Sequence, residues 1–217
     1  MPTLYDITPP ITARTNVWPG DTPPTREVLC DLASGASVTL STIRTTTHLG
    51  AHADGPNHYA HSAPGIGERP LHHYLGPCVV LHATVPRAQR VGLAHLGLAD
   101  VGALRRAVVH PRVLIRTDTF PDFERWNADF AAIDPALIDA LATCAVVTIG
   151  IDTPSVDLQG STDLPTHHAI ARHDMAILEG LDLSAVPAGA YELIALPLKL
   201  IGYDASPVRA VLRPLQP

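Results

Sequence analysis

The apolar positions of this chain fall mostly into short runs separated by proline and glycine, a pattern more typical of strands than of long helices. Residues 145–151, for example, form a continuous apolar, β-branched run that predicts a buried strand. The 21 prolines are spread along the 217 residues and exclude a helical bundle. The predicted strands are residues 4–7, 38–47, 79–85, 112–117, 145–151, 175–178, 193–198 and 208–212.

Helices are predicted between some of these strands. Asp134-Pro135 is a typical helix start, because aspartate caps free backbone N–H groups and proline fits the first helical position. Because the chain shows no internal repeat, low-complexity segment or linker-like change of composition, we expect one mixed α/β domain over residues 1–217. The predicted helices are residues 98–108, 134–144 and 166–173.

Composition narrows the class of protein. With 46% apolar and 17% charged residues, the chain is expected to be globular, and its net charge of −6 gives no sign of a nucleic-acid or membrane surface. No apolar run reaches the length of a membrane span, and the first residues lack the pattern of a secretory leader. Cys30, Cys78 and Cys144 are widely spaced and odd in number, so we expect reduced thiols and a cytoplasmic protein.

One short segment concentrates potential metal ligands. His48, His52, Asp54 and His58 lie within eleven residues, and imidazole and carboxylate groups suit zinc, or manganese or iron. His52 and Asp54 are two residues apart, so on an extended segment they point to the same side. Gly50 allows a turn that brings His48 to the same point. Three ligands without cysteine predict a catalytic metal site with open coordination positions.

His58, the last of these four residues, has two possible roles. It lies just beyond Pro56 and is a candidate fourth ligand or a proton shuttle beside the metal.

Further polar groups follow the predicted strands. Asp152 stands at the end of a buried strand, where open α/β sheets tend to place their sites, and Glu179 ends the apolar run 175–178. Glu179 is therefore either a solvated side chain or a ligand. Asp152 and Asp157 are either caps or partners that orient ligands, and His167 and His168 are further candidates for a second metal.

The histidine segment resembles a known signature. His48-Leu-Gly-Ala-His52-Ala-Asp54-Gly-Pro-Asn-His58 is similar to the H-x-G-T-H-x-D-x-P-x-H motif of the cyclase-type metal-dependent hydrolases, with alanine in place of the threonine, which is not a ligand. Other segments resemble the bacterial kynurenine formamidase branch of that family, so the resemblance spans nearly the whole chain. These segments are residues 17–23, 150–157, 177–181 and 191–198.

The resemblance implies a swivelling β/β/α fold, a homodimer and the hydrolysis of N-formyl-L-kynurenine to L-kynurenine and formate. It implies that His48, His52 and Asp54 bind one zinc ion. It also implies that Asp54 bridges to a second zinc ion held by His167 and Glu179.

The remaining roles follow from the same resemblance. His167 is preferred to His168 because the family's ligand lies twelve residues before the glutamate. His58 would be the acid/base residue, and Trp18, in the proline-rich loop of residues 18–24, would line the substrate pocket. The alternative for Trp18 is packing in a core or a dimer.

Two other functions remain open. One is another amidohydrolase of the family that opens a cyclic amide or a lactone with the same metal site. The other, from a different class, is a metal-binding module without catalysis, although such a module has no use for an acid/base such as His58.

Overall fold

The computed structural model describes residues 4–215. Its main feature is a curled nine-stranded sheet in which the β5, β7, β9 and β10 strands are parallel and all other neighbours are antiparallel. The sheet order is β1 (Tyr5–Asp6), β13 (Val211–Pro214), β11 (Gly189–Ile194), β5 (Leu75–His82), β7 (Arg112–Arg116), β9 (Thr148–Ile151), β10 (Ala176–Glu179), β4 (His52–Asp54) and β12 (Ala205–Pro207).

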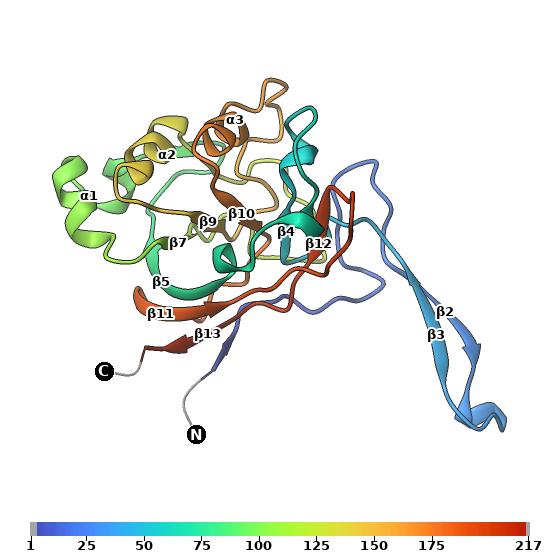
Figure 1. Ribbon diagram of the computed structural model, residues 1–217. Coiled ribbons are helices and arrows are strands. Elements are labelled where there is room, and N and C mark those ends of the chain that lie inside the picture. The colour runs from blue at the N-terminus through green and yellow to red at the C-terminus, as the bar shows by residue number, and fades with distance from the viewer. Residues whose placement is uncertain (1–3, 216–217) are drawn as a thin grey trace.

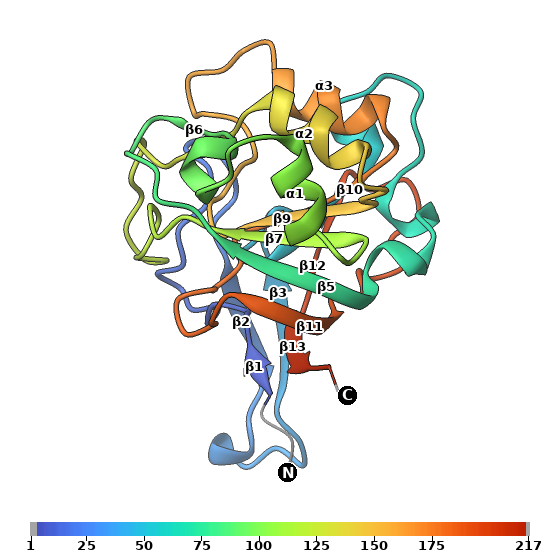
Figure 2. The same cartoon turned by 90° about the vertical axis from the view of Figure 1, so that its left-hand side faces the viewer.

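In Figure 2 three α-helices lie over one face of this sheet, and β11, β13 and β1 form the part of the sheet farthest from them. Asp134 caps the second helix as predicted, since its carboxylate accepts the Ala136 N–H. Short 3₁₀ turns occupy several loops. The helices are α1 (Val101–Ala107), α2 (Pro135–Ala142) and α3 (Pro165–Arg172), and the turns are η1 (Leu32–Ser34), η2 (Pro56–His58), η3 (Ile66–Glu68), η4 (Leu71–His73) and η5 (Leu93–Leu96).

The central strands are buried on both faces. In β7, Val113 and Ile115 pack under the helices, whereas Leu114 between them packs into a second core against β5 and β11. Strands that alternate between two cores show a continuous apolar run in the sequence. The prediction of an α/β fold with a mixed sheet is confirmed.

Two smaller sheets complete the fold. β6 (Arg90–Val91) pairs with β8 (Ala132–Ile133), and β2 (Thr25–Cys30) pairs with β3 (Leu40–Arg44) in a hairpin that extends away from the body (Figure 1). The strand predicted over residues 38–47 is therefore shorter, and it belongs to this exposed hairpin. The prediction of a strand over residues 193–198 is wrong after Ile194, where β11 ends.

Two further expectations concern cysteines and membranes. Cys30, Cys78 and Cys144 all carry free thiols. Within residues 4–215, no helix combines the length and the apolar character that crossing a membrane requires.

Candidate metal centre

The cluster forms where β10 ends beside β4. The two strands are antiparallel with Glu179 directly opposite His52, so these side chains meet across the sheet, and Asp54 follows two residues later on the same face. Gly180 has φ +64° and a Cβ there would lie 2.2 Å from the Gly50 carbonyl oxygen, so only glycine lets β10 end this close to the histidine segment.

Two further histidines reach the cluster from other elements. His48 precedes β4 and is brought back by the turn expected at Gly50, which has a φ of +54° in the left-handed region. His167 comes from the first turn of α3, on the helix-covered face of the sheet. His167 is buried, whereas its neighbour His168 is exposed. The structure therefore brings together all five predicted ligands.

The two oxygens of Asp54 face different sets of donors. Oδ1 lies 3.1 Å from His48 Nδ1 and 3.5 Å from His52 Nε2, while Oδ2 lies 3.7 Å from His167 Nε2. The carboxylate of Glu179 spans both sides, at 3.3 Å from His52 Nε2 through Oε2 and 3.8 Å from His167 Nε2 through Oε1.

These distances suit donors around a cation better than hydrogen bonds. Ligands about 2 Å from a tetrahedral zinc ion lie about 3.3 Å from one another, whereas the longer contacts here exceed ordinary hydrogen-bond lengths. His52 Nε2 and both Asp54 oxygens are buried and have no hydrogen-bond partner within residues 4–215. Buried polar atoms are rarely left unpaired, so a bound metal ion fits this donor set.

The electrostatics agree with cation binding. Burial lowers the pKa of His48, but contacts with Asp54, Glu179 and Asp204 outweigh it and raise the pKa to about 9. Burial likewise opposes a charged His167, while Asp157 and Asp54 raise its pKa to about 10. A group of carboxylates that draws protons to imidazoles also attracts a divalent cation, which releases those protons on binding.

Partners outside the cluster hold the ligands in place. His52 Nδ1 lies 2.9 Å from the Gly50 carbonyl oxygen, and His167 Nδ1 lies 2.8 Å from Asp157 Oδ2. Asp157 also accepts the Thr166 and His167 N–H groups and pairs with Arg90 at 2.7 Å. Asp157 therefore both caps α3 and orients a ligand. Such partners fix the ring orientation of metal-bound histidines.

His58 lies beside the cluster. Its ring centroid is 4.3 Å from that of His48 and 6.1 Å from that of His167. Loss of hydration in the surrounding protein lowers the pKa of His58 below its ordinary value, so the imidazole is largely neutral near pH 7. His58, His48 and Asp54 place donor atoms within 4.8 Å of one another. Its position is compatible with either predicted role, proton shuttle or ligand.

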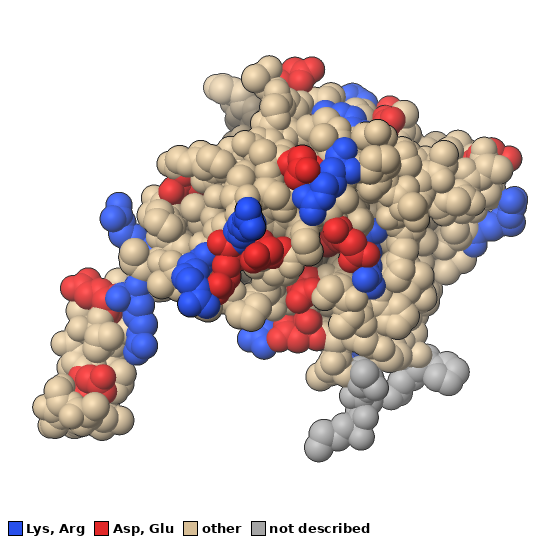
Figure 3. All heavy atoms as spheres, turned by 180° about the vertical axis from the view of Figure 1, so that it is seen from behind, with Lys and Arg blue, Asp and Glu red and all other residues tan. Residues whose placement is uncertain are grey.

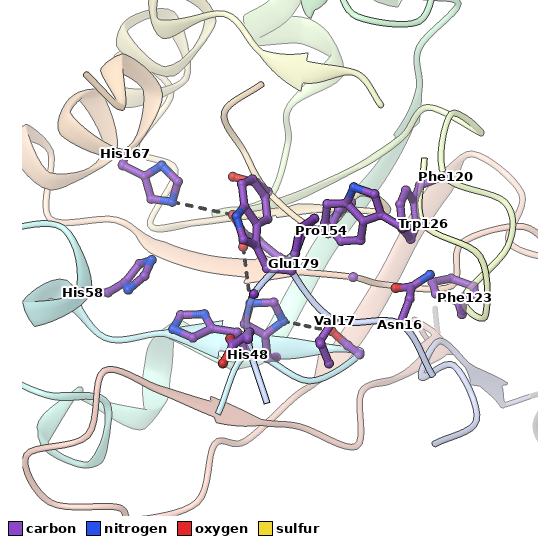
Figure 4. Close-up of a pocket in the computed structure, with 18 of the residues that line it drawn as sticks. Asn16, Val17, His48, His58, Phe120, Phe123, Trp126, Pro154, His167 and Glu179 are labelled. Atoms are coloured by element: carbon purple, nitrogen blue, oxygen red, sulfur yellow. Dashed lines mark hydrogen bonds and ion pairs between the residues drawn. The ribbon is translucent and has the colours of Figure 1, made fainter. Parts of the chain in front are cut away.

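A cavity of about 520 Å³ opens above these residues. Figure 4 shows His48, His58 and His167 at one end and Phe120, Phe123 and Trp126 at the other. Trp18 lines the same cavity, and its ring packs edge-on against Trp126 with centroids 5.3 Å apart. The cavity therefore joins a polar, cation-binding end to an aromatic end.

Several site residues were missed at the level of sequence. Asp204, whose Oδ2 lies 3.1 Å from His48 Nε2, comes from a distant loop and has no local sequence signal. The aromatic end of the cavity does have a sequence signal, because all three phenylalanines and one of the two tryptophans lie within residues 120–130. The carboxylate of Asp152 lies outside the cluster and accepts the Thr117 and Asp118 N–H groups at the start of this aromatic segment.

Comparison with known proteins gives the family. The family model described as "Putative cyclase" matches residues 5–158. Relatives named kynurenine formamidase, from Bordetella pertussis (strain Tohama I) and Bordetella bronchiseptica (strain RB50), are each 47% identical over 215 residues, 99% of this chain and 100% of each relative.

Solved structures share the fold. A potential metal-dependent hydrolase with cyclase activity has a TM-score of 0.81 and 25% identity, and the alignment covers 99% of both chains. An isatin hydrolase bound to the product analogue thioisatinate has a TM-score of 0.80, with 98% of this chain and 92% of that chain covered; at 18% identity this is a likeness of fold alone. The family resemblance predicted from the histidine motif is confirmed, and the chain belongs to the cyclase family.

Proposed function

We propose that this protein hydrolyses N-formyl-L-kynurenine to L-kynurenine and formate, and that it acts as a cytoplasmic homodimer with two zinc ions. The observation that carries the proposal is the cavity with two chemically different ends. One end holds the cluster of histidines and carboxylates, and the other is lined by Trp18, Phe120 and Trp126. The 47% identity to relatives named kynurenine formamidase supports the choice of substrate.

The donor set supports two zinc ions. His48 and His52 face one oxygen of Asp54, and His167 faces the other, so Asp54 can bridge two ions with Glu179 as a further ligand. When bound, zinc supplies Lewis acidity and lowers the pKa of water towards neutrality.

The protein's own groups perform the proton transfers. His58, with its lowered pKa, is a base at neutral pH and can accept the proton of the attacking water. The same imidazolium can then protonate the aniline nitrogen as the formyl C–N bond breaks. The formyl group requires little space near the cluster, and the aryl ring fits against the aromatic end, where edge-on rings such as Trp18 and Trp126 form an apolar wall.

The test is a spectrophotometric assay of N-formylkynurenine hydrolysis with metal-replete protein, with and without a chelator, and with isatin as the comparison substrate. We expect turnover of N-formylkynurenine that the chelator abolishes and that zinc restores. Faster turnover of isatin would show a lactam hydrolase of the same family. Hydrolysis of neither substrate at full metal content would show a metal-binding module without catalysis.

His58 separates catalysis from metal binding. His58→Asn is expected to lower kcat by about 10²- to 10⁴-fold, the usual contribution of a general acid/base, with the zinc content unchanged. Loss of zinc in this variant, measured by atomic emission, would show instead that His58 is a ligand. His61→Asn, three residues further along and exposed, is the matched control.

A further inference from the structure

One acidic side chain in the cavity takes no part in the metal centre. Asp21 and Glu179 are the acidic residues that line the cavity, and no lysine or arginine lines it within residues 4–215. Glu179 belongs to the cluster of predicted ligands, whereas Asp21 belongs to neither group of described residues that could hold a metal ion. The presence of Asp21 in the cavity therefore needs an explanation of its own.

A tight turn brings Asp21 to the cavity together with Trp18. The Asp21 N–H donates to the Trp18 carbonyl oxygen at 2.9 Å. Pro19 is the second residue of this turn, and Gly20 is the third, with φ +96°. Proline followed by a glycine of positive φ is the pattern of a type II turn, whose first and last residues lie within about 7 Å of each other. Trp18 and Asp21 therefore border the same small part of the cavity.

Backbone hydrogen bonds anchor this turn on both sides. On its N-terminal side, the Asn16 N–H donates to the Phe123 carbonyl oxygen at 2.9 Å. On its C-terminal side, the Thr46 N–H donates to the Thr22 carbonyl oxygen at 3.0 Å, two residues before the predicted ligand His48. A binding group that is already held in place loses little conformational freedom when its ligand arrives. The turn is therefore suited to position a substrate between the aromatic end and the metal centre.

The carboxylate of Asp21 has one oxygen available to a ligand. Its Oδ1 accepts the Thr22 N–H at 2.7 Å, and its Oδ2 has no hydrogen-bond or ion-pair partner within the part of the chain that the structure describes. Elsewhere on the surface, Figure 3 shows acidic and basic side chains side by side, and exposed carboxylates such as Glu124 pair with an arginine, here Arg14. A carboxylate oxygen without such a partner, at the wall of a cavity, attracts a cationic group of a ligand.

We propose that Asp21 binds the ammonium group of the substrate, and that the cavity selects aryl formamides whose neighbouring acyl chain carries a cationic amine. The inference rests on the proposed hydrolysis of N-formyl-L-kynurenine and names the group that the protein recognises beyond the aryl ring. In that substrate a short acyl chain joins the ring to the ammonium group. A ring packed against Trp18 therefore brings the ammonium group towards Asp21, three residues further along the same turn.

The cavity has no matching group for the carboxylate of an amino-acid substrate. Lysine and arginine are absent from its lining within residues 4–215, and the histidines that line it belong to the metal centre or lie beside it. We therefore expect the substrate's carboxylate to point towards solvent and to contribute little to binding. It follows that N-formylkynurenamine, which keeps the ammonium group and lacks the carboxylate, is a substrate as well.

The test compares four aryl formamides that share the reacting bond. N-formylkynurenine carries both charged groups, N-formylkynurenamine only the ammonium group, desamino-N-formylkynurenine only the carboxylate, and 2-formamidoacetophenone neither. With native, zinc-loaded protein, we expect kcat/KM for N-formylkynurenamine to equal or exceed that for N-formylkynurenine. It should be about fivefold higher than for 2-formamidoacetophenone, the upper limit for an exposed ion pair. The desamino compound should be the slowest.

Asp21→Asn removes the charge and keeps an oxygen that can accept the Thr22 N–H. We expect this variant to lower the ratio of kcat/KM for N-formylkynurenamine to that for 2-formamidoacetophenone about fivefold, to near one. Asp100→Asn is the matched control, because exposed Asp100 also accepts a backbone N–H at 2.7 Å, from Ala103, but caps α1 outside the cavity. If Asp21 only supported the turn, its loss would slow all four compounds alike and leave the ratio unchanged.

Charge reversal gives an independent check of the same contact. Asp21→Lys is expected to invert the order, so that desamino-N-formylkynurenine is hydrolysed faster than N-formylkynurenamine. Added salt should reduce the native preference for the amine, because ions screen exposed charges. Equal substrate ratios in the native, Asp21→Asn and Asp21→Lys proteins would overturn the ammonium site and leave the proposed hydrolysis intact. Hydrolysis of none of the four compounds by native, zinc-loaded protein would instead refute the proposed activity on which the inference rests.

Discussion

Asp157 offers the most direct test of how the metal ligands are held. Its Oδ2 lies 2.8 Å from His167 Nδ1, and its Oδ1 lies 2.7 Å from an Arg90 nitrogen. The side chain is fully buried. Asp157→Asn keeps the shape but removes the charge, and it places an amide N–H₂ against groups that are all donors. We expect His167 to lose its fixed orientation and the metal to bind more weakly.

The expected loss of metal affinity follows from the effect of removing such carboxylates in other metal-binding proteins. Loss of a carboxylate behind a metal-bound histidine weakens metal affinity by about 10- to 100-fold, or about 1.4–2.7 kcal/mol. A competition titration with a chromophoric chelator measures the zinc affinity without reference to turnover. The control is Asp139→Asn, because Asp139 also pairs with a histidine, His173, at 2.8 Å, but lies exposed outside the site. Native zinc affinity in folded Asp157→Asn would refute this role for Asp157.

Two further predictions concern the aromatic end of the cavity. Burial raises the pKa of Asp152 to about 6, although hydrogen bonds from Thr117 and Asp118 partly oppose this shift. Between about pH 4 and 6, the folded state therefore binds a proton that the unfolded state does not bind. The native protein should therefore lose about 3 kcal/mol of stability relative to Asp152→Asn as the pH rises from 4 to 7; parallel curves of unfolding free energy against pH would contradict this. Trp18→Leu should raise KM for N-formylkynurenine about two- to tenfold with a smaller change in kcat, and an unchanged KM with a lowered melting temperature would assign Trp18 to packing.

The central part of the fold could be predicted from apolar patterning because its strands are buried on both faces. β7 and β9 lie within the predicted segments, and α2 begins at the predicted Asp134-Pro135 pair. The hairpin of β2 and β3 could be predicted only in part, because the strand expected over residues 38–47 contains β3 but no strand was expected at β2. Its apolar side chains suggest burial, but within residues 4–215 they are exposed, and β2 has no apolar pattern that separates it from a loop.

The residues of the site likewise include some that the sequence predicts and some that it does not. His48, His52 and Asp54 are close in sequence, so their spacing alone indicates a common point in space. Asp204 and Arg90 reach the site through tertiary structure, and a lone aspartate or arginine in a loop or strand carries no sign of its partner.

The spacing between His167 and Glu179 has a structural explanation that the sequence resemblance alone did not provide. α3 has eight residues, three residues follow it, and β10 has four, so the chain runs along the helix and returns along the strand. Because helix and strand run in opposite directions, the first turn of α3 lies above the last residue of β10. A ligand in that turn and one at the strand end are therefore twelve residues apart yet share one metal centre. His168 is one position further round the helix, about 100° away, and its side chain is exposed.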